Sequence, residues 1–116
     1  MTDTTALDEL IKAVEAGDEW VSVKADAAFD DKGNAVMACR AYGADGHPER
    51  AGSLDAAKAL HDALLPGWWY VIDHRMCSVS DMFDGPFFSQ DTHDSPARAW
   101  LLAVLRAYRA QIGGAA

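Results

Sequence analysis

The segment that most constrains the fold is residues 53–72, SLDAAKALHDALLPGWWYVI, because it encodes a helix, a break and a strand without interruption. Ser53 is a typical N-cap residue, and Pro66-Gly67 ends the helix that follows it. The apolar positions of that helix recur at helical spacing: Leu54, Ala57, Leu60, Ala63 and Leu64. Residues 68–76 then read as a strand with aromatic residues on both faces. We expect both faces to be covered, by layers of the same chain or by a second copy in a homodimer.

The N-terminal half predicts a helix followed by a β-hairpin. Leu7, Leu10, Ile11 and Val14 have helical spacing within residues 6–16, and Gly17 follows as a stop. Apolar residues alternate along residues 20–29, which predicts a strand. Residues 30–34 predict a turn in which Gly33 or Asn34 has positive φ, and residues 35–42 predict the returning strand. Residues 43–52, rich in glycine, predict a surface loop.

The C-terminal part predicts more sheet and a closing helix. Residues 76–83 either continue the preceding strand or re-enter the sheet as a separate strand. Because residues 74–80 contain no glycine or proline, the sequence favours one long bent strand that turns at Asp84-Gly85. Ser95-Pro96 is an N-cap followed by proline at the first helical position, and the helical pattern runs on to Ile112. The arginines of this helix are expected to pair with neighbouring carboxylates rather than to bind phosphate: Arg98, Arg106 and Arg109.

The predicted fold is a single α+β domain over residues 1–116, with a frayed tail at about residues 113–116. Its element order is helix, two strands, helix, two strands, helix. We expect an antiparallel sheet of about four strands with three helices packed on it as a layered sandwich.

The charge is strongly negative, with 10 basic and 18 acidic residues giving −8 at pH 7. Residues 1–58 carry 6 basic and 12 acidic residues, so most of the excess lies in the first half. Direct binding to nucleic acid or to an anionic membrane is therefore not expected, because both require clusters of Lys and Arg. The acidic start lacks an apolar signal core, and no apolar run is long enough to span a bilayer, so we expect a cytoplasmic protein.

The sequence contains one polar cluster that could form a site: Asp73, His74, Cys77, Asp91, His93 and Asp94. These residue types ligate metals or act as acids and bases. Their spacing argues against it, because residues 74 and 77 of a strand lie on opposite faces and residues 91–94 are expected in the loop before a helix. We therefore predict no metal and no cofactor. Cys39 and Cys77 are expected to be buried free thiols on strands, and Trp68, Trp69 and Trp100 to be core residues rather than a base-stacking platform.

Three blocks resemble the phage ABA sandwich domain family of small bacteriophage and prophage proteins. They are Ser53-Leu54-Asp55-Ala56-Ala57 leading to Ala59-Leu60, Pro66-Gly67-Trp68, and Ser95-Pro96-Ala97-Arg98-Ala99 with residues 101–107. The resemblance implies a helix–sheet–helix sandwich of phage or prophage origin. It implies no activity and no functional residues, because the family has no general assigned activity.

Function is expected to be non-catalytic: a phage or prophage accessory protein that binds a host protein. An inhibitor of a bacterial defence complex, similar to an anti-CRISPR, is one such protein, since carboxylates can imitate a phosphate backbone against a basic nucleic-acid-binding groove. The candidate partner-binding residues are acidic: Asp30, Asp31, Asp45, Glu49, Asp81 and Asp84. Two alternatives stay open, a metal- or ligand-binding protein or enzyme that uses Asp73, His74 and His93, and a structural or assembly protein of the virion.

Overall fold

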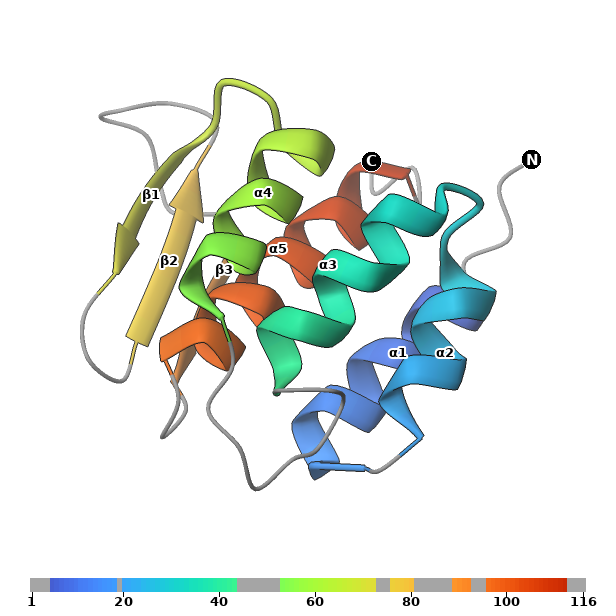
Figure 1. The fold of residues 1–116 in the computed structure, drawn as a ribbon. Helices are drawn as coiled ribbons and strands as arrows, with labels where there is room; N and C mark the ends of the chain where they lie inside the picture. The colour runs from blue at the N-terminus through green and yellow to red at the C-terminus, as the bar shows by residue number, and fades with distance from the viewer. Residues whose placement is uncertain are drawn as a thin grey trace.

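The computed structural model describes residues 5–18, 20–43, 53–72, 76–80, 89–92 and 96–112, with the backbone alone for residues 76–77 and 89–92. In this part of the chain there are five helices and three strands. They are α1 (Thr5–Ala16), α2 (Val21–Ala28), α3 (Lys32–Tyr42), α4 (Leu54–Leu64), β1 (Trp69–Ile72), β2 (Met76–Ser80), β3 (Ser89–Thr92) and α5 (Pro96–Ile112). The helices pack against one another, and the sheet lies at one end of the molecule next to α4 and α5 (Figure 1).

The expected sandwich of about four strands and three helices is wrong, because both strands of the predicted N-terminal hairpin are helices. In the segment that forms α2, the alternating apolar residues contain a second pattern at i, i+4 and i+8. Val21, Ala25 and Phe29 are buried on this helical face, whereas Val23 is 55% exposed. The apolar pattern of this segment fits both the strand period and the helix period. Alanine favours helix over strand, and α2 and α3 contain three alanines each, so their helix propensity favours the helical structure.

The predicted hairpin turn at residues 30–34 is instead a helix start. The Asp31 carboxylate caps α3 by accepting a hydrogen bond from the Gly33 N–H at 2.8 Å. Gly33 itself lies inside α3, and the described glycines with positive φ are Gly17 and Gly67. The buried residues of α3 have helical spacing: Ala35, Ala38, Ala41 and Tyr42. The hairpin is therefore made of two helices rather than two strands.

The other three helices are confirmed at nearly the expected bounds. Ser53 caps α4, its Oγ accepting a hydrogen bond from the Ala56 N–H at 3.1 Å. Gly17 and Gly67 follow α1 and α4 with φ of 71° and 81°, the conformation that favours glycine after a helix. Pro96 is the first residue of α5, as predicted.

The sheet is antiparallel with the order β1-β2-β3. Trp69 pairs with Ser80 and Ile72 with Cys77, so the chain reverses between Ile72 and Met76, where one long bent strand was expected. Residue 91 belongs to β3 and pairs with Cys77, which corrects the expectation that it lies in a loop. The predicted turn at Asp84-Gly85 lies outside the described residues. Without neighbouring Gly or Pro, the first reversal had no turn signal to reveal it.

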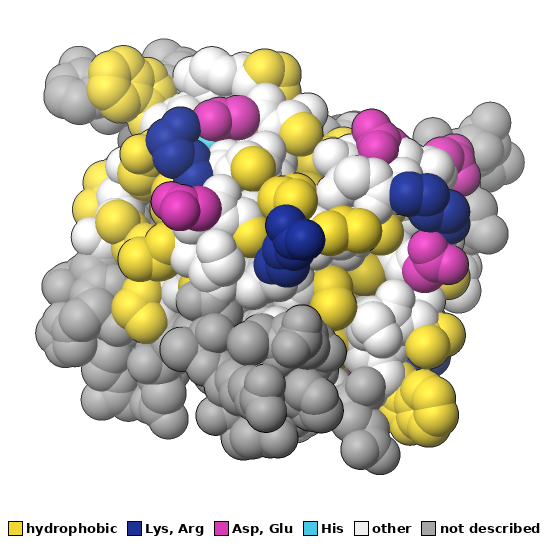
Figure 2. All heavy atoms as spheres, viewed as in Figure 1, with side chains coloured by type: hydrophobic (Ala, Val, Ile, Leu, Met, Phe, Trp, Pro, Cys, Tyr) yellow, Lys and Arg dark blue, Asp and Glu magenta, His cyan; other side chains and the backbone are white. Residues whose placement is uncertain are grey.

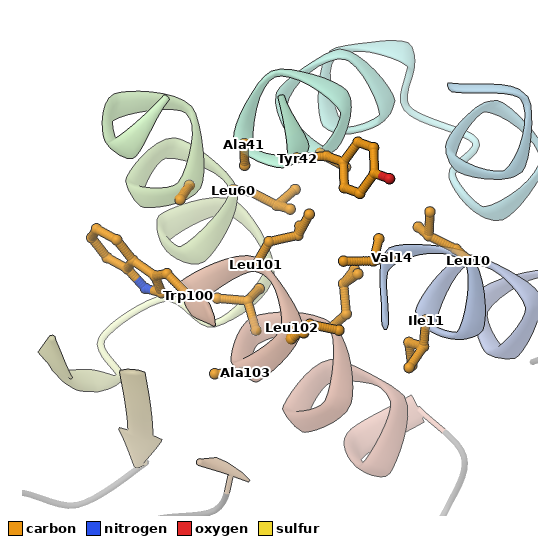
Figure 3. Packing of buried hydrophobic residues seen from close by; sticks show 14 of the residues in the cluster. Leu10, Ile11, Val14, Ala41, Tyr42, Leu60, Trp100, Leu101, Leu102 and Ala103 are labelled. Atoms are coloured by element: carbon orange, nitrogen blue, oxygen red, sulfur yellow. The ribbon is translucent and has the colours of Figure 1, made fainter. Parts of the chain in front are cut away.

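Helix α5 is the centre of the fold, because it contacts α1, α3 and α4 and also β2 and β3. Its side chains are buried on nearly all sides from Ala97 to Leu105. Figure 3 shows Leu101 and Leu102 of α5 pointing toward apolar residues of α1, α3 and α4, whereas Trp100 points to the side of α4 and the sheet. A helix that is apolar all round is expected only where other elements cover it completely.

Candidate functional site

Ion pairs within the chain occupy most of the described basic side chains. Arg109 binds Asp8 at 2.7 Å, and Arg106 binds Glu15 at 2.8 Å, which confirms the predicted pairing of both arginines. The other pairs are Lys24–Glu9, Lys32–Asp26 and Lys58–Asp62. On the face shown in Figure 2, most Lys and Arg side chains correspondingly lie beside an Asp or Glu. The pKa of Lys58 is raised above its usual value, mainly by its hydrogen bond to Asp62 and to a smaller extent by the negative charge of Asp62.

Arg98 has a different role from the other two arginines of α5, because it is buried. Its Nε donates a hydrogen bond to the Tyr42 carbonyl oxygen at 2.6 Å. Its guanidinium carbon also lies 4.2 Å from the centroid of the Tyr42 ring. Arg98 therefore ties α5 to the end of α3.

Of the six acidic residues predicted to bind a partner, the structure describes Asp30 and Asp31. Both are exposed and lie in the connection between α2 and α3. Neither is in an ion pair in the described part of the chain, and Asp31 uses one oxygen, Oδ1, to cap α3. The remaining four lie outside the described residues: Asp45, Glu49, Asp81 and Asp84.

The alternative polar cluster is described only at two backbone positions. Cys77 and residue 91 are paired across β2 and β3, so the register brings these two positions side by side. The other members lie outside the described residues: Asp73, His74, His93 and Asp94. Among the residues that are described, no group of three or more His, Cys, Asp or Glu side chains is arranged to hold a metal ion.

A cleft of about 580 Å³ lies beside Asp30 and Asp31, where four helices meet. The first turns of α1 and α3, the last turn of α2 and the C-terminal part of α5 all contribute to it. We call it the Asp30–Asp31 cleft, and its described lining consists of Ala6, Leu7, Ala27, Ala28, Phe29, Asp30, Asp31, Asn34, Tyr108 and Ile112. The cleft therefore combines an apolar wall with polar groups at the connection of α2 and α3.

Two aromatic rings form part of the apolar wall. The ring centroids of Phe29 and Tyr108 are 6.3 Å apart and the rings are tilted by 32°. Phe29 is buried, while Tyr108 is partly exposed. Aromatic faces carry negative charge density, so this wall favours an apolar or cationic group.

The sign of the charge in the cleft is decided by the carboxylates. The positive N-terminal ends of α1 and α3 and the negative C-terminal ends of α2 and α5 all reach the cleft, so the helix dipoles largely offset one another. Its described lining contains two acidic residues and no basic one. The nearby Arg109 is bound to Asp8. The cleft is therefore an acidic site.

A second hollow of about 560 Å³ follows the outer surface between α2 and α3. It is lined by Ser22, Val23, Asp26, Lys32, Ala35, Val36, Cys39 and Arg40. Cys39 was expected to be buried on a strand, but it lies in α3 and is partly exposed. Lys32 and Arg40 outnumber Asp26 here, so this groove does not continue the acidic cleft.

The tryptophans separate into core and surface residues. Trp100 is 4% exposed and belongs to the core, as predicted, and Trp68 packs partly buried against it. Trp69 is 49% exposed, so the expectation that it is a core residue is wrong. Val71, on the same face of β1, is similarly exposed, so no layer of the described chain covers this face, and cover by a second copy stays a prediction.

Sequence reasoning found the acidic part of the cleft but missed its aromatic wall. Phe29 directly precedes Asp30, and this Phe-Asp-Asp run was the available signal. Tyr108 is distant in sequence and comes into contact only when α5 packs against α1.

No protein-family model matches the chain, and no curated protein or solved structure gives a significant match. Membership of the phage ABA sandwich domain family therefore stays a prediction. Within the described ranges, none of the helices is both long and apolar enough to cross a membrane.

Proposed function

We propose that this chain is a non-catalytic accessory protein of a bacteriophage or prophage that binds a basic host protein. The observation that carries the proposal is the exposed pair Asp30 and Asp31 beside an open cleft. Most other carboxylates of the described helices are held in ion pairs with neighbouring Lys and Arg. Asp30 and Asp31 are thus available to a basic partner.

The distribution of charge along the sequence supports the same kind of partner. Nine of the 18 acidic and eight of the 10 basic residues have described side chains, which leaves nine acidic and two basic residues in the rest of the chain. The net charge of −8 thus comes mainly from those other segments, including Asp45, Glu49, Asp81 and Asp84. Such an excess attracts a positively charged protein surface and accelerates its encounter.

A basic nucleic-acid-binding groove is the class of surface that this charge fits. Carboxylates spaced on a folded protein can take the place of phosphates in such a groove. A bacterial defence complex that binds nucleic acid has a groove of this kind, and its inhibition is the biological role that we propose.

The proposal is tested by affinity capture with charge-neutralised variants. The wild-type chain and the D30N/D31N variant are immobilised, and bacterial lysate is passed over each at about 0.15 M salt, where exposed charges still interact over several ångströms. Asparagine is as good an N-cap as aspartate, so the substitution at residue 31 preserves the start of α3. The matched control is D55N/D62N, which removes two exposed charges from α4.

We expect one basic protein to be retained by the wild type and the control, to be lost with D30N/D31N, and to elute when salt is raised to about 0.5 M. Retention that is equal for all three proteins, or that is insensitive to salt, would contradict the proposal. Capture of an acidic protein alone would contradict it as well.

A further inference from the structure

We infer that the Asp30–Asp31 cleft binds a guanidinium group, the side chain of an arginine presented by a protein. The inference rests on the proposed function only in assigning the arginine to a basic host protein. The ligand class follows from the cleft itself: its size, its aromatic wall and the kind of hydrogen-bonding atoms around it.

The cleft has room for such a group together with its aliphatic chain. Its volume of about 580 Å³ lies within the range of natural ligand sites. The apolar residues Leu7, Phe29 and Ile112 offer a surface for the methylene groups of the arginine side chain. An isolated ion would leave this apolar surface without a partner.

The polar groups of the cleft can all accept hydrogen bonds. Asp30 is exposed and takes part in no ion pair with the described residues, and Asp31 keeps Oδ2 available while Oδ1 accepts from Gly33. The Asn34 side-chain carbonyl and the Tyr108 hydroxyl add two neutral acceptors. A guanidinium has five N–H donors and no acceptor, so its hydrogen-bonding groups complement this set.

The aromatic wall favours guanidinium over ammonium. A planar guanidinium stacks on an aromatic ring and binds a carboxylate through two parallel hydrogen bonds, whereas the compact lysine ammonium does neither. Arg98 of this chain already makes the first of these contacts, with its guanidinium carbon 4.2 Å from the centroid of the Tyr42 ring. The ring of Tyr108, which lines the cleft and is partly exposed, offers a comparable surface to an arginine from outside, and the buried ring of Phe29 packs beside it at a centroid distance of 6.3 Å.

The charges that surround the cleft do not cancel those of Asp30 and Asp31. Arg109 does not neutralise a carboxylate of the cleft, since its Nε donates a hydrogen bond to Oδ1 of Asp8 at 2.7 Å. Lys32 is bound to Asp26 at 2.9 Å, on the outer side of α3. An incoming guanidinium therefore meets two carboxylates whose charge no basic residue in the described part of the chain neutralises.

The inference is tested by nuclear magnetic resonance with a small probe. N-acetyl-L-arginine methylamide is titrated into the full-length ¹⁵N-labelled chain, and backbone shifts are followed. The lysine and norleucine analogues serve as controls for ammonium and for apolar binding, and free L-arginine tests whether an α-carboxylate weakens binding beside Asp30 and Asp31.

We expect a dissociation constant of about 1–10 mM for the arginine probe, as is reasonable for one side chain, with shifts centred on residues 28–34 and 108–112. The lysine and free-arginine probes should bind at least about threefold more weakly than the arginine probe, and binding of the norleucine probe should not saturate. D30N and D31N should each weaken arginine binding about three- to tenfold, whereas the control D55N should leave it unchanged.

Equal binding of the arginine and norleucine probes would overturn the inference, as would shifts away from the cleft or unchanged affinity in D30N and D31N. The two experiments distinguish failure of the guanidinium site from failure of the proposed function. A basic partner that is captured through Asp30 and Asp31 while the arginine probe fails leaves the function intact and rejects the guanidinium site. Binding of the probe without any captured partner supports the site and rejects the proposed function.

Discussion

The indole nitrogen of Trp100 lies 3.3 Å from Nδ1 of His61 and donates a hydrogen bond to it. Since Nδ1 is the acceptor, the neutral imidazole carries its proton on Nε2, which lies 3.0 Å from the Trp68 carbonyl oxygen and donates to it. His61 is 1% exposed and has Tyr70 and Trp100 at its edges. These contacts join α4, α5 and the start of β1, so one buried side chain attaches the sheet to the helices.

His61→Ala is expected to destabilise the fold by about 2–4 kcal/mol, because it leaves a cavity and removes the partners of two buried polar groups. Urea unfolding followed by tryptophan fluorescence measures the change. Lys58→Ala is the control, an exposed position on the same helix with an expected cost of about 0.5 kcal/mol or less. Equal costs for the two variants would show that the His61 contacts do not attach the sheet.

Trp100→Ala is expected to cost about 3–5 kcal/mol, because the indole is 4% exposed and contacts Tyr70 at a ring distance of 4.5 Å. Trp69→Ala removes the same group from a side chain that is 49% exposed, so its expected cost is about 1 kcal/mol or less. The difference is measured by thermal and urea unfolding. If Trp69→Ala were as costly as Trp100→Ala, the exposed face of β1 would have to be part of the core.

Arg98→Lys is expected to cost about 1.5–3 kcal/mol. Lysine keeps the charge but loses both the Nε hydrogen bond to Tyr42 and the flat stacking surface over its ring. Arg106→Lys is the matched control, because its partner Glu15 and Arg106 itself are partly exposed, and such pairs contribute less than about 1 kcal/mol. Similar unfolding midpoints for the two variants would contradict the structural role of Arg98.

Gly67→Ala is expected to cost about 1–2 kcal/mol, because Gly67 has φ of 81° and an L side chain is strained there. An added Cβ would meet no atom within 4 Å, so the cost comes from the backbone conformation alone. Gly67→Asn should cost less, since asparagine tolerates this conformation better. Equal stability of the alanine variant and the wild type in urea unfolding would contradict this explanation.

The sequence was sufficient for the helices that have end signals. Gly17 follows α1, Ser53 caps α4, Gly67 lies shortly after its end, and Pro96 begins α5, and these residues limit the possible structures locally. α2 and α3 lack such clear signals: Gly33 suggested a turn, and the apolar residues 21, 25 and 29 belong to both a strand and a helix pattern. The alanines of both segments favour helix, and the helices against which they pack, α1 for α2 and α4 and α5 for α3, bury the helical face.

The candidate site could be predicted in part for a similar reason. Asp30 and Asp31 are adjacent in sequence and polar, so their exposure was predictable. The contact of Phe29 with Tyr108 depends on the packing of both α5 and α2 against α1, which no local pattern encodes. Carboxylates without a cleft predict only a charged surface, and the cleft is a property of the folded chain.

The most direct measurement is the affinity of N-acetyl-L-arginine methylamide for the wild type and for D30N/D31N under identical salt conditions. If Asp30 and Asp31 form the binding site, the wild type binds the probe in the millimolar range and the double variant binds it about tenfold more weakly or not at all. Equal affinity of the two proteins for the probe would contradict this conclusion.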